Sequence, residues 1–311
     1  MRALVTGACG FVGGYLARHL TECADTVLGT FLHERPILPC ESTQLDISEP
    51  SQCLEVVSSF KPEVVYHLAG MAFVPDAEKN FAKALSINVA GTYNMLAASH
   101  ALGLPVKFVL VSSAQVYGKI EPKDLPLSEQ TALSPIDNYS ISKCMAELVC
   151  ERFRFNSKVQ TIIMRPFNHI GAGQRVEFAV SSFAYQLAEI AKKTRPAVLK
   201  VGNLDAQRDF TDVKDIVRGY RLAAVKGQGI YNLCSGKPIS MKSVLEQLIQ
   251  VSGLSITIEK DTERMRPADT PILYGCAAKA KHELGWQPEI SFQDSLQAIY
   301  KYWLDSSTLQ R

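Results

Sequence analysis

The stretch that decides the fold of this chain is Ala3-Leu4-Val5-Thr6-Gly7-Ala8-Cys9-Gly10-Phe11-Val12-Gly13, which is followed by a helical pattern of apolar residues. It predicts a buried strand, a glycine-rich turn and a helix. In that context Gly7 allows a tight turn, Gly10 lets backbone N–H groups approach a pyrophosphate, and Gly13 lets the helix pack against the strand. We therefore predict a dinucleotide-binding turn whose cofactor contacts are Gly7, Gly10, Phe11, Val12 and Gly13.

The composition narrows the class of protein. The 311 residues include 33 basic and 31 acidic side chains with no basic block or acidic tail, so neither nucleic acid nor a membrane surface is an expected partner. The first predicted strand begins at Arg2, which leaves no room for a signal peptide, and no apolar run reaches membrane-spanning length, so we expect a cytoplasmic protein. The eight cysteines show no CxxC spacing and are predicted to be reduced, packed thiols, with neither a disulfide framework nor a metal site.

The second predicted strand, residues 26–30, would end near the ribose of the adenosine. No acidic residue stands at its tip, where an NAD site usually has one, so the sequence favours NADP(H) over NAD(H) as the cofactor. Arg35 or His33 would then contact the phosphate, and the alternative for Arg35 is a solvated loop charge. After the next short strand, Asp46 and Ile47 are predicted to contact the adenine.

A further buried strand is predicted for residues 63–70, which end in small residues where the backbone must lie close to a ligand. Leu68, Ala69 and Gly70 are therefore predicted cofactor contacts. His67 lies in the apolar part of this strand and is predicted to be a packed core histidine rather than a catalytic one. Strands and helices alternate through this half of the chain, which predicts an α/β fold built on a doubly wound parallel Rossmann sheet.

Three residues are candidates for acid–base chemistry. Ser113 follows a buried strand at its carboxyl end, where open α/β sheets bind ligands, and a serine there can donate to a substrate oxygen. Tyr139 and Lys143 are four residues apart, so they share one face of a helix that Asp137 or Asn138 can cap. We expect the Lys143 ammonium to lower the pKa of Tyr139 and tune the phenol for proton transfer. The alternatives are a surface contact for the pair and, for the serine, a bond to its own backbone.

Together these motifs resemble the extended short-chain dehydrogenases/reductases that act on nucleotide sugars, and the resemblance runs from Arg2 to about Trp303. The glycine-rich turn, the position of Ser113 and the Tyr139–Lys143 spacing match the superfamily. Four stretches are similar to a narrower group, the GDP-mannose 4,6-dehydratases and GDP-6-deoxy-4-keto-mannose reductases: residues 165–174, 200–213, 231–236 and 264–269.

The resemblance implies a domain division and a set of contacts. A dinucleotide-binding Rossmann domain would comprise residues 1–166 with 204–236, and a smaller C-terminal substrate-binding domain would comprise 167–203 with 237–311. Arg165 is an implied cofactor contact beside the tyrosine and lysine. A nucleotide-diphosphate sugar is the implied substrate, and its implied contacts are Ser113, Gln115, Asn168, Val201, Arg208 and Arg266.

Two of these implications have a physical basis in the side chains. Guanidinium groups match phosphate oxygens, which suits Arg208 and Arg266, and the alternative is an ion pair between the domains. For Arg208 the nearby acids in the sequence are Asp209, Asp212 and Asp215. Family members often dimerise through two helices per subunit, so a homodimer is expected through the helix containing Asn88 and the helix starting at Tyr139.

The residues after the strand-end serine distinguish the reactions of the family. Dehydratases that resemble this chain carry a glutamate where Gln115 stands, and the thymidine type carries an aspartate before it, where this chain has Ala114. An amide can neither take nor give the proton that dehydration moves. The resemblance therefore implies reduction of the C4 ketone of a nucleotide-linked 6-deoxy-4-keto sugar by NAD(P)H, from GDP-4-keto-6-deoxy-D-mannose to GDP-D-rhamnose. The alternatives are a nucleotide-sugar 4-epimerase, a GDP-mannose 4,6-dehydratase that uses another acid, and a non-catalytic NADP-binding protein.

Overall fold

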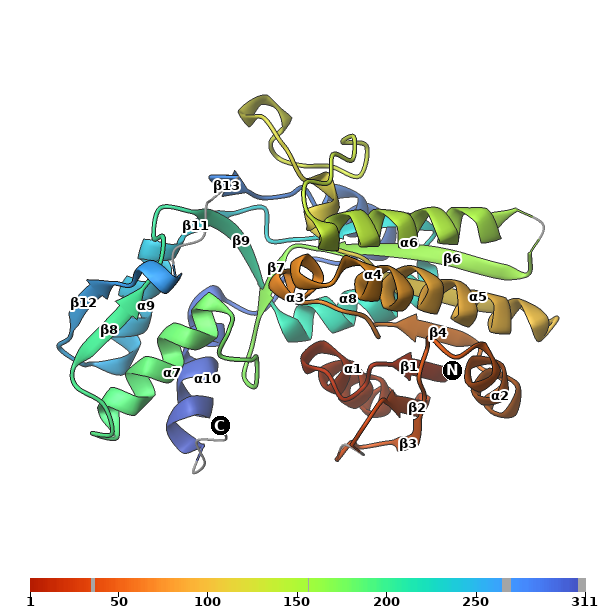
Figure 1. The fold of residues 1–311 in the computed structure, drawn as a ribbon, viewed down its shortest axis with the longest axis horizontal. Coiled ribbons are helices and arrows are strands. Elements are labelled where there is room, and N and C mark those ends of the chain that lie inside the picture. Colours follow the sequence, from red (N-terminus) through yellow and green to blue (C-terminus); the bar gives the residue numbers. More distant parts are fainter. Residues whose placement is uncertain (35–36, 156, 265–269, 307–311) are drawn as a thin grey trace.

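The computed structural model describes residues 1–34, 37–155, 157–264 and 270–306, and its largest sheet has seven strands in the order β10-β6-β5-β4-β1-β2-β3 (Figure 1). All neighbouring strands in it are parallel. The chain runs outward from β1 to β3, then returns to β4 and runs outward the other way, which confirms the predicted doubly wound sheet. The strands are β1 (Arg2–Thr6), β2 (Thr26–Phe31), β3 (Glu41–Gln44), β4 (Val64–His67), β5 (Val106–Val111), β6 (Val159–Pro166) and β10 (Gly229–Leu233).

Helices cover both faces of this sheet, because successive side chains of a strand point to opposite sides. Ala3 and Val5 pack on one side with α1 (Phe11–Glu22) and α8 (Val213–Lys226). Leu4 packs on the other side, with α2 (Pro50–Phe60), α5 (Gly91–Ala101) and α6 (Asn138–Arg154). Shorter helical elements connect these layers: α3 (Val74–Lys79), α4 (Phe81–Leu85), η1 (Ser86–Ala90), η2 (Ala114–Tyr117) and η3 (Pro122–Asp124).

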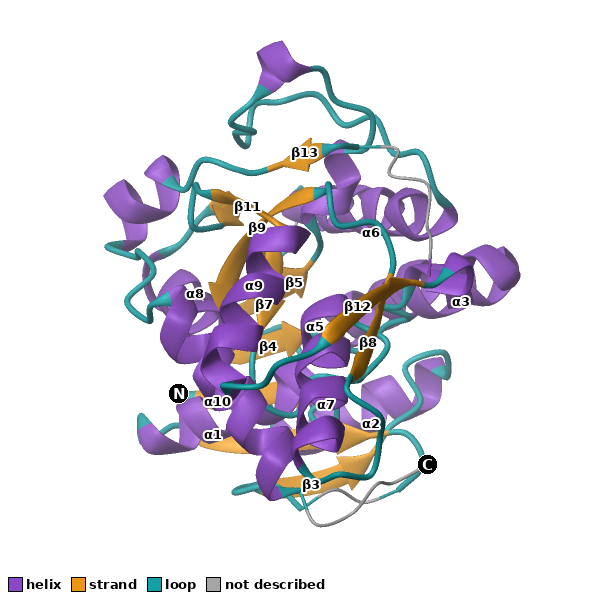
Figure 2. Cartoon of the chain, turned by 90° about the vertical axis from the view of Figure 1, so that its left-hand side faces the viewer, coloured by secondary structure: helices purple, strands orange, loops and turns teal. Residues whose placement is uncertain are grey.

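The second half of the molecule lies beyond the carboxyl ends of the large sheet (Figure 1). Its central strand β9 pairs with β7, β11 and β13, while β8 pairs with β12. Figure 2 views the molecule from this side, with β8, β12 and the helices α7, α9 and α10 in front of the large sheet. The elements are β7 (Asn168–Ile170), α7 (Ala179–Ala191), β8 (Val198–Val201), β9 (Gln207–Asp212), β11 (Pro238–Ser240), α9 (Met241–Ser252), β12 (Thr257–Lys260), η4 (Thr262–Arg264), β13 (Ile272–Leu273), η5 (Ala280–Leu284) and α10 (Phe292–Asp305).

Two segments depart from the predicted division of the chain. The strand β9, which lies inside 204–236, joins the small sheet because Phe210 packs into the core of the second half. In contrast, η5 and Trp286, which lie inside 237–311, pack against the large sheet. Trp286 is fully buried there, and its indole N–H donates to the carbonyl of Asp215 at 2.8 Å.

All eight cysteines are free thiols. Cys53, Cys150 and Cys234 are buried as predicted, but Cys9 is exposed because it lies at the outside of the glycine-rich turn. Among the described residues, no helix combines the length and the apolar character needed to cross a membrane.

Candidate active site

The glycine-rich turn has the backbone that its sequence predicts. Gly7 has a φ of +69°, and a Cβ on it would lie 2.9 Å from the backbone of Ala69. A Cβ on Gly13 would overlap the carbonyl oxygen of Gly7, so the helix approaches the turn as closely as predicted. No side chain caps α1, whose N-cap residue is Gly10, so the first amide groups of the helix lack a capping partner. A pyrophosphate fits such a helix N-terminus.

Phe11 and Val12, the two residues after Gly10, have side chains in different surroundings. Val12 is half-buried against the sheet. The ring of Phe11 stacks on His169 of β7, with 6.3 Å between ring centroids and 5° between the planes. Phe11 therefore links the start of α1 to the second half of the molecule, and its predicted contact with a cofactor stays a prediction.

The loop after β4 is fixed from within the sheet. The hydroxyl oxygen of Thr6 accepts from the backbone N–H groups of Leu68 and Ala69, both at 3.1 Å. Because that oxygen then donates its own proton to His67 Nδ1 at 2.9 Å, the histidine carries its proton on Nε2. Burial lowers the pKa of His67 to about 3, so the ring is neutral. The prediction of a packed core histidine is confirmed, and it helps to hold the loop of Leu68, Ala69 and Gly70.

The three acid–base candidates gather beside this loop. Tyr139 and Lys143 lie one turn apart on α6, and both are buried. The Lys143 ammonium donates to the carbonyl of Val111, the last residue of β5, at 2.9 Å, and a Cβ on Gly70 would lie 3.7 Å from the same nitrogen. The side chain of Ser113 lies close enough to Tyr139 to lower the pKa of the phenol. The phenol and the ammonium therefore lie inside the molecule next to the loop that contacts the glycine-rich turn, and the surface-contact alternative is wrong.

The pKa values of the pair differ from the prediction. Burial raises the pKa of Tyr139 to about 12, opposed by the hydrogen bond from Ser113. Burial also lowers the pKa of Lys143 to about 8, opposed by the carboxylate of Glu147. The Tyr139 pKa is thus raised where the sequence predicted a lowered one, and the Lys143 ammonium, which donates to the carbonyl of Val111, is not among the groups that shift it. The consequence is a phenol that keeps its proton at neutral pH, which is the form a proton donor needs.

Ser113 has both of the roles that the sequence left open. Its Oγ accepts from the backbone N–H of Gln115 at 3.2 Å and so caps η2, as a loop serine does. The same side chain also lies near the Tyr139 phenol and lowers its pKa. Ala114 is buried and apolar, and Gln115 is exposed and carries an amide. Neither of these two residues supplies an acid.

Arg208 lies half-buried on β9 and donates only to backbone carbonyls. Burial lowers its pKa, and no acidic side chain pairs with it among the described residues. The three nearby acids are engaged elsewhere: Asp209 by Ser235, Asp212 by Ser295 and Asp215 by Arg218. The alternative of an ion pair with these aspartates is therefore wrong.

Asn168 is exposed on β7, and it pairs with Phe210, two residues from Arg208 on the same side of the sheet. Both side chains thus lie on the strands nearest the carboxyl ends of the large sheet. Val201, in contrast, is fully buried in the core of the second half, and its carbonyl accepts from the N–H of Asp261 at 2.8 Å. A contact of the Val201 side chain with the substrate is therefore wrong.

Three predicted cofactor contacts are engaged within the protein. The carboxylate of Asp46 accepts from both the N–H and the hydroxyl of Ser48, which lowers its pKa. Ile47 is buried against Gly91 of α5, and the Arg165 guanidinium is buried in an ion pair with Glu147. Ile47 and Arg165 can therefore reach a cofactor only through their backbone. Two further candidates, Arg35 and Arg266, lie outside the described residues.

Sequence reasoning missed two residues that build the site. Asn88 accepts from the N–H of Met71 at 2.8 Å and donates to the hydroxyl of Ser142 at 2.8 Å, so it joins the loop after β4 to α6. Glu147, on α6 one turn after Lys143, accepts from Ser112 and Arg165 and so joins this helix to the sheet. The i,i+4 spacing of Glu147 from Lys143 was a signal for the second residue. Nothing in the local sequence marked Asn88, because its partners come from distant segments.

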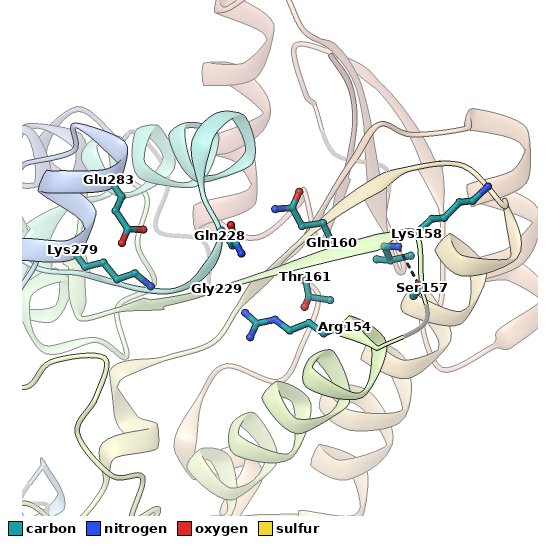
Figure 3. A pocket seen from close by; sticks show the side chains of 10 residues that line it. Arg154, Ser157, Lys158, Gln160, Thr161, Gln228, Gly229, Lys279 and Glu283 are labelled. Atoms are coloured by element: carbon teal, nitrogen blue, oxygen red, sulfur yellow. Dashed lines mark hydrogen bonds between the residues drawn. The ribbon is translucent and has the colours of Figure 1, made fainter.

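A cavity of about 760 Å³ lies at the opposite end of the sheet, where β6 and β10 begin (Figure 3). Parallel strands place their carboxyl ends at one edge, so this cavity is separate from the site of Tyr139. Its lining includes Arg154 at the end of α6, Gln160 at the start of β6, and Lys279 and Glu283, which lie directly before and within η5.

Comparisons with known proteins agree with this geometry. The family model described as GDP-mannose 4,6 dehydratase matches residues 4–299. The GDP-6-deoxy-D-mannose reductase of Pseudomonas aeruginosa is 34% identical over 304 residues, which cover 97% of each chain. The GDP-6-deoxy-D-talose 4-dehydrogenase of Aggregatibacter actinomycetemcomitans is 30% identical, with 92% of each chain covered.

A solved structure has the same fold throughout. The structure of RMD from Pseudomonas aeruginosa complexed with NADPH matches with a TM-score of 0.88 and 32% sequence identity, and the match covers 98% of this chain and 99% of the other. The sequence match and the fold match both extend over nearly the whole chain, and the glycine-rich turn, Ser113, Tyr139 and Lys143 are all in place. The chain belongs to the GDP-mannose 4,6 dehydratase family of extended short-chain dehydrogenases/reductases.

Proposed function

We propose that this protein reduces the C4 ketone of a nucleotide-linked 6-deoxy-4-keto sugar, with GDP-4-keto-6-deoxy-D-mannose as substrate and GDP-D-rhamnose as product. The observation that carries the proposal is a buried Tyr139 that keeps its proton, with Ser113 near the phenol, Lys143 one turn along the same helix, and Gln115 where the dehydratases that resemble this chain carry an acid. The likeness to the GDP-6-deoxy-D-mannose reductase of Pseudomonas aeruginosa supports the substrate.

Each side chain has a separate task in this reduction. A bound nicotinamide supplies the hydride for the ketone carbon. Ser113 donates a hydrogen bond to the ketone oxygen, and Tyr139 gives that oxygen its proton. Lys143 holds the nicotinamide ribose through hydrogen bonds from its ammonium. Arg208 and Asn168 bind the diphosphate, since Arg208 has no acidic partner among the described residues.

The cofactor in this proposal is NADP(H) rather than NAD(H). The strand β2 ends at Phe31 with no acidic residue at its tip, where an NAD site usually has one to accept from the 2′-hydroxyl. The solved structure with NADPH, which has the same fold, supports this choice. A comparison of the Kd values for NADPH and NADH tests it, and a tighter NADH complex would contradict it.

The decisive experiment is incubation of the protein with GDP-4-keto-6-deoxy-D-mannose and either reduced cofactor. We expect stoichiometric loss of reduced nicotinamide and formation of GDP-D-rhamnose, identified by the stereochemistry of the released sugar. Interconversion of C4 epimers without net loss of the reduced cofactor would show an epimerase instead. Formation of the 4-keto sugar from GDP-mannose would show a dehydratase.

The same proposal includes a homodimer through α5 and α6. Tyr93 of α5 and Leu148 of α6 are large apolar residues with 53% and 68% of their surface exposed. Neighbouring apolar residues on two adjacent helices are typical of an interface rather than of an isolated surface.

A further inference from the structure

Glu147 is a buried acid to which the proposed mechanism gives no task. It lies on α6 one turn after Lys143, and it is 4% exposed. Its carboxylate accepts from the Nε of Arg165 at 3.0 Å and from the Nη2 of Arg165 at 2.7 Å, a bidentate pair in which both partners are buried. Such a pair costs desolvation energy and adds little net stability, so stability alone does not account for its presence.

The third contact of Glu147 leads to the catalytic serine. The hydroxyl of Ser112 donates to the Oε1 of Glu147 at 2.5 Å, and Ser112 is the residue directly before Ser113. The carboxylate therefore holds the end of β5, which carries Ser113, against the helix that carries Lys143. The Lys143 ammonium also joins α6 to the end of β5, because it donates to the carbonyl of Val111.

Arg165 anchors this group of residues in the sheet. It lies on β6, and its Nη1 donates to the hydroxyl of Tyr117 at 3.2 Å, with the guanidinium 5.1 Å from the centroid of the Tyr117 ring. That hydroxyl donates in turn to the side-chain carbonyl of Asn232 on β10 at 2.7 Å. Three neighbouring strands, β5, β6 and β10, are thus joined to α6 through a single carboxylate.

We propose that Glu147, held by Arg165, is a positioning residue that sets the place and the charge of Lys143 relative to Ser113. The inference rests on the proposed function, because it assigns a task within that reaction. Glu147 does not touch the substrate or the cofactor in this scheme. It acts through Lys143, whose ammonium must be present to hold the ribose.

The charges around Lys143 show how this would work. On its own helix the groups that act on it are Glu147, which favours the ammonium, and Cys150; from β4 the neutral ring of His67 faces it. With the acid present, burial brings the pKa of Lys143 to about 8. Removing the acid would leave the Arg165 charge without its partner and would lower the pKa of Lys143 further. The ammonium would then be lost at a lower pH.

The test compares the alkaline limb of the pH dependence of cofactor affinity in the wild-type protein and in two variants. Glu147→Gln removes the charge, and the paired variant Glu147→Gln/Arg165→Met removes both buried charges, so that a folded protein is obtained even if the single variant is unstable. We expect the pH above which NADPH affinity falls to drop by about one unit in the single variant and by less in the paired variant. At pH 8 a drop of one unit lowers the protonated fraction of Lys143 from about one half to about one tenth, roughly a five-fold loss.

A control variant separates the charge of Glu147 from that of other acids on the helix. Glu151→Gln removes a half-buried acid one turn further along α6 that pairs with Arg154. It should keep the alkaline limb of the wild-type protein. An unchanged limb in a folded Glu147→Gln variant would overturn the proposal, and so would a paired variant whose limb drops by more than one unit. Because cofactor binding is measured without substrate, this result is independent of whether the protein reduces the 4-keto sugar.

Discussion

Tyr139 is the residue from which the proposed reduction takes its proton. Replacing Tyr139 by Phe removes the hydroxyl and keeps the ring, so the rate should fall by roughly 10²–10⁴ while the cofactor still binds. The measurement is single-turnover reduction together with the Kd for NADPH. Burial raises the pKa of Tyr139 to about 12, which lies above the range in which the Lys143 ammonium titrates. The pH profile of the Tyr139→Phe variant should therefore still follow the titration of Lys143. Turnover at the wild-type rate with bound cofactor would contradict the role of Tyr139.

Arg208 should act on binding rather than on the chemical step. Arg208→Met keeps much of the length of the side chain and removes the charge, so KM should rise about ten-fold or more while kcat changes little, if the diphosphate is held alike in ground and transition state. Arg18→Met is the matched control, because Arg18 is an exposed arginine on the outer side of α1. An equal fall of kcat in the Arg208 variant would show that this residue contributes to the transition state instead.

At the scale of residues, the sequence predicted which candidate acid–base side chains lie together but not the direction of the tyrosine pKa shift. Ser113, Tyr139 and Lys143 were predicted from spacing and from their places at a strand end and on a helix face, and the structure brings them together. The direction of the tyrosine pKa was missed, because it depends on burial by segments far away in the chain. The burial of Val201 and of the Ile47 side chain was missed for the same reason.

At the scale of elements, two adjacent glycines of α1 give opposite predictions. Gly13→Ala places a methyl group on the carbonyl oxygen of Gly7, so we expect a loss of about 1–3 kcal/mol in the free energy of unfolding and weaker NADPH binding. Gly14→Ala is the matched control, because its nearest atom would be the carbonyl oxygen of Ala8 at 3.8 Å. Within a helix that change should stabilise by about 0.5–1 kcal/mol. Denaturant titration and cofactor titration of both variants measure these effects, and equal behaviour of the two would refute the close approach.

The elements of the large sheet were predictable because their sequence signals are local. Buried strands, a glycine-rich turn and Asp137 as a cap each act within a few residues, and Asp137 does accept from Ser140 at the start of α6. The pairing of β9 was not predictable in this way. Its partners β7, β11 and β13 come from three separate parts of the chain, and only the packing of the second half selects among them.

At the scale of the whole molecule, the apolar residues of α5 and α6 predict a dimer that a single charge should separate. Leu148→Lys places an ammonium in the proposed interface. Burying this unpaired charge would cost more free energy than the contacts between the two subunits provide. We expect the wild-type protein to have the mass of a dimer by light scattering and the variant to have the mass of a monomer, with an unchanged circular dichroism spectrum. Ile258→Lys on β12 is the matched control, since Ile258 is an exposed apolar residue, 46% exposed, at the other end of the molecule (Figure 1). A monomeric wild-type protein, or a Leu148→Lys variant that stays dimeric, would remove α5 and α6 as the interface.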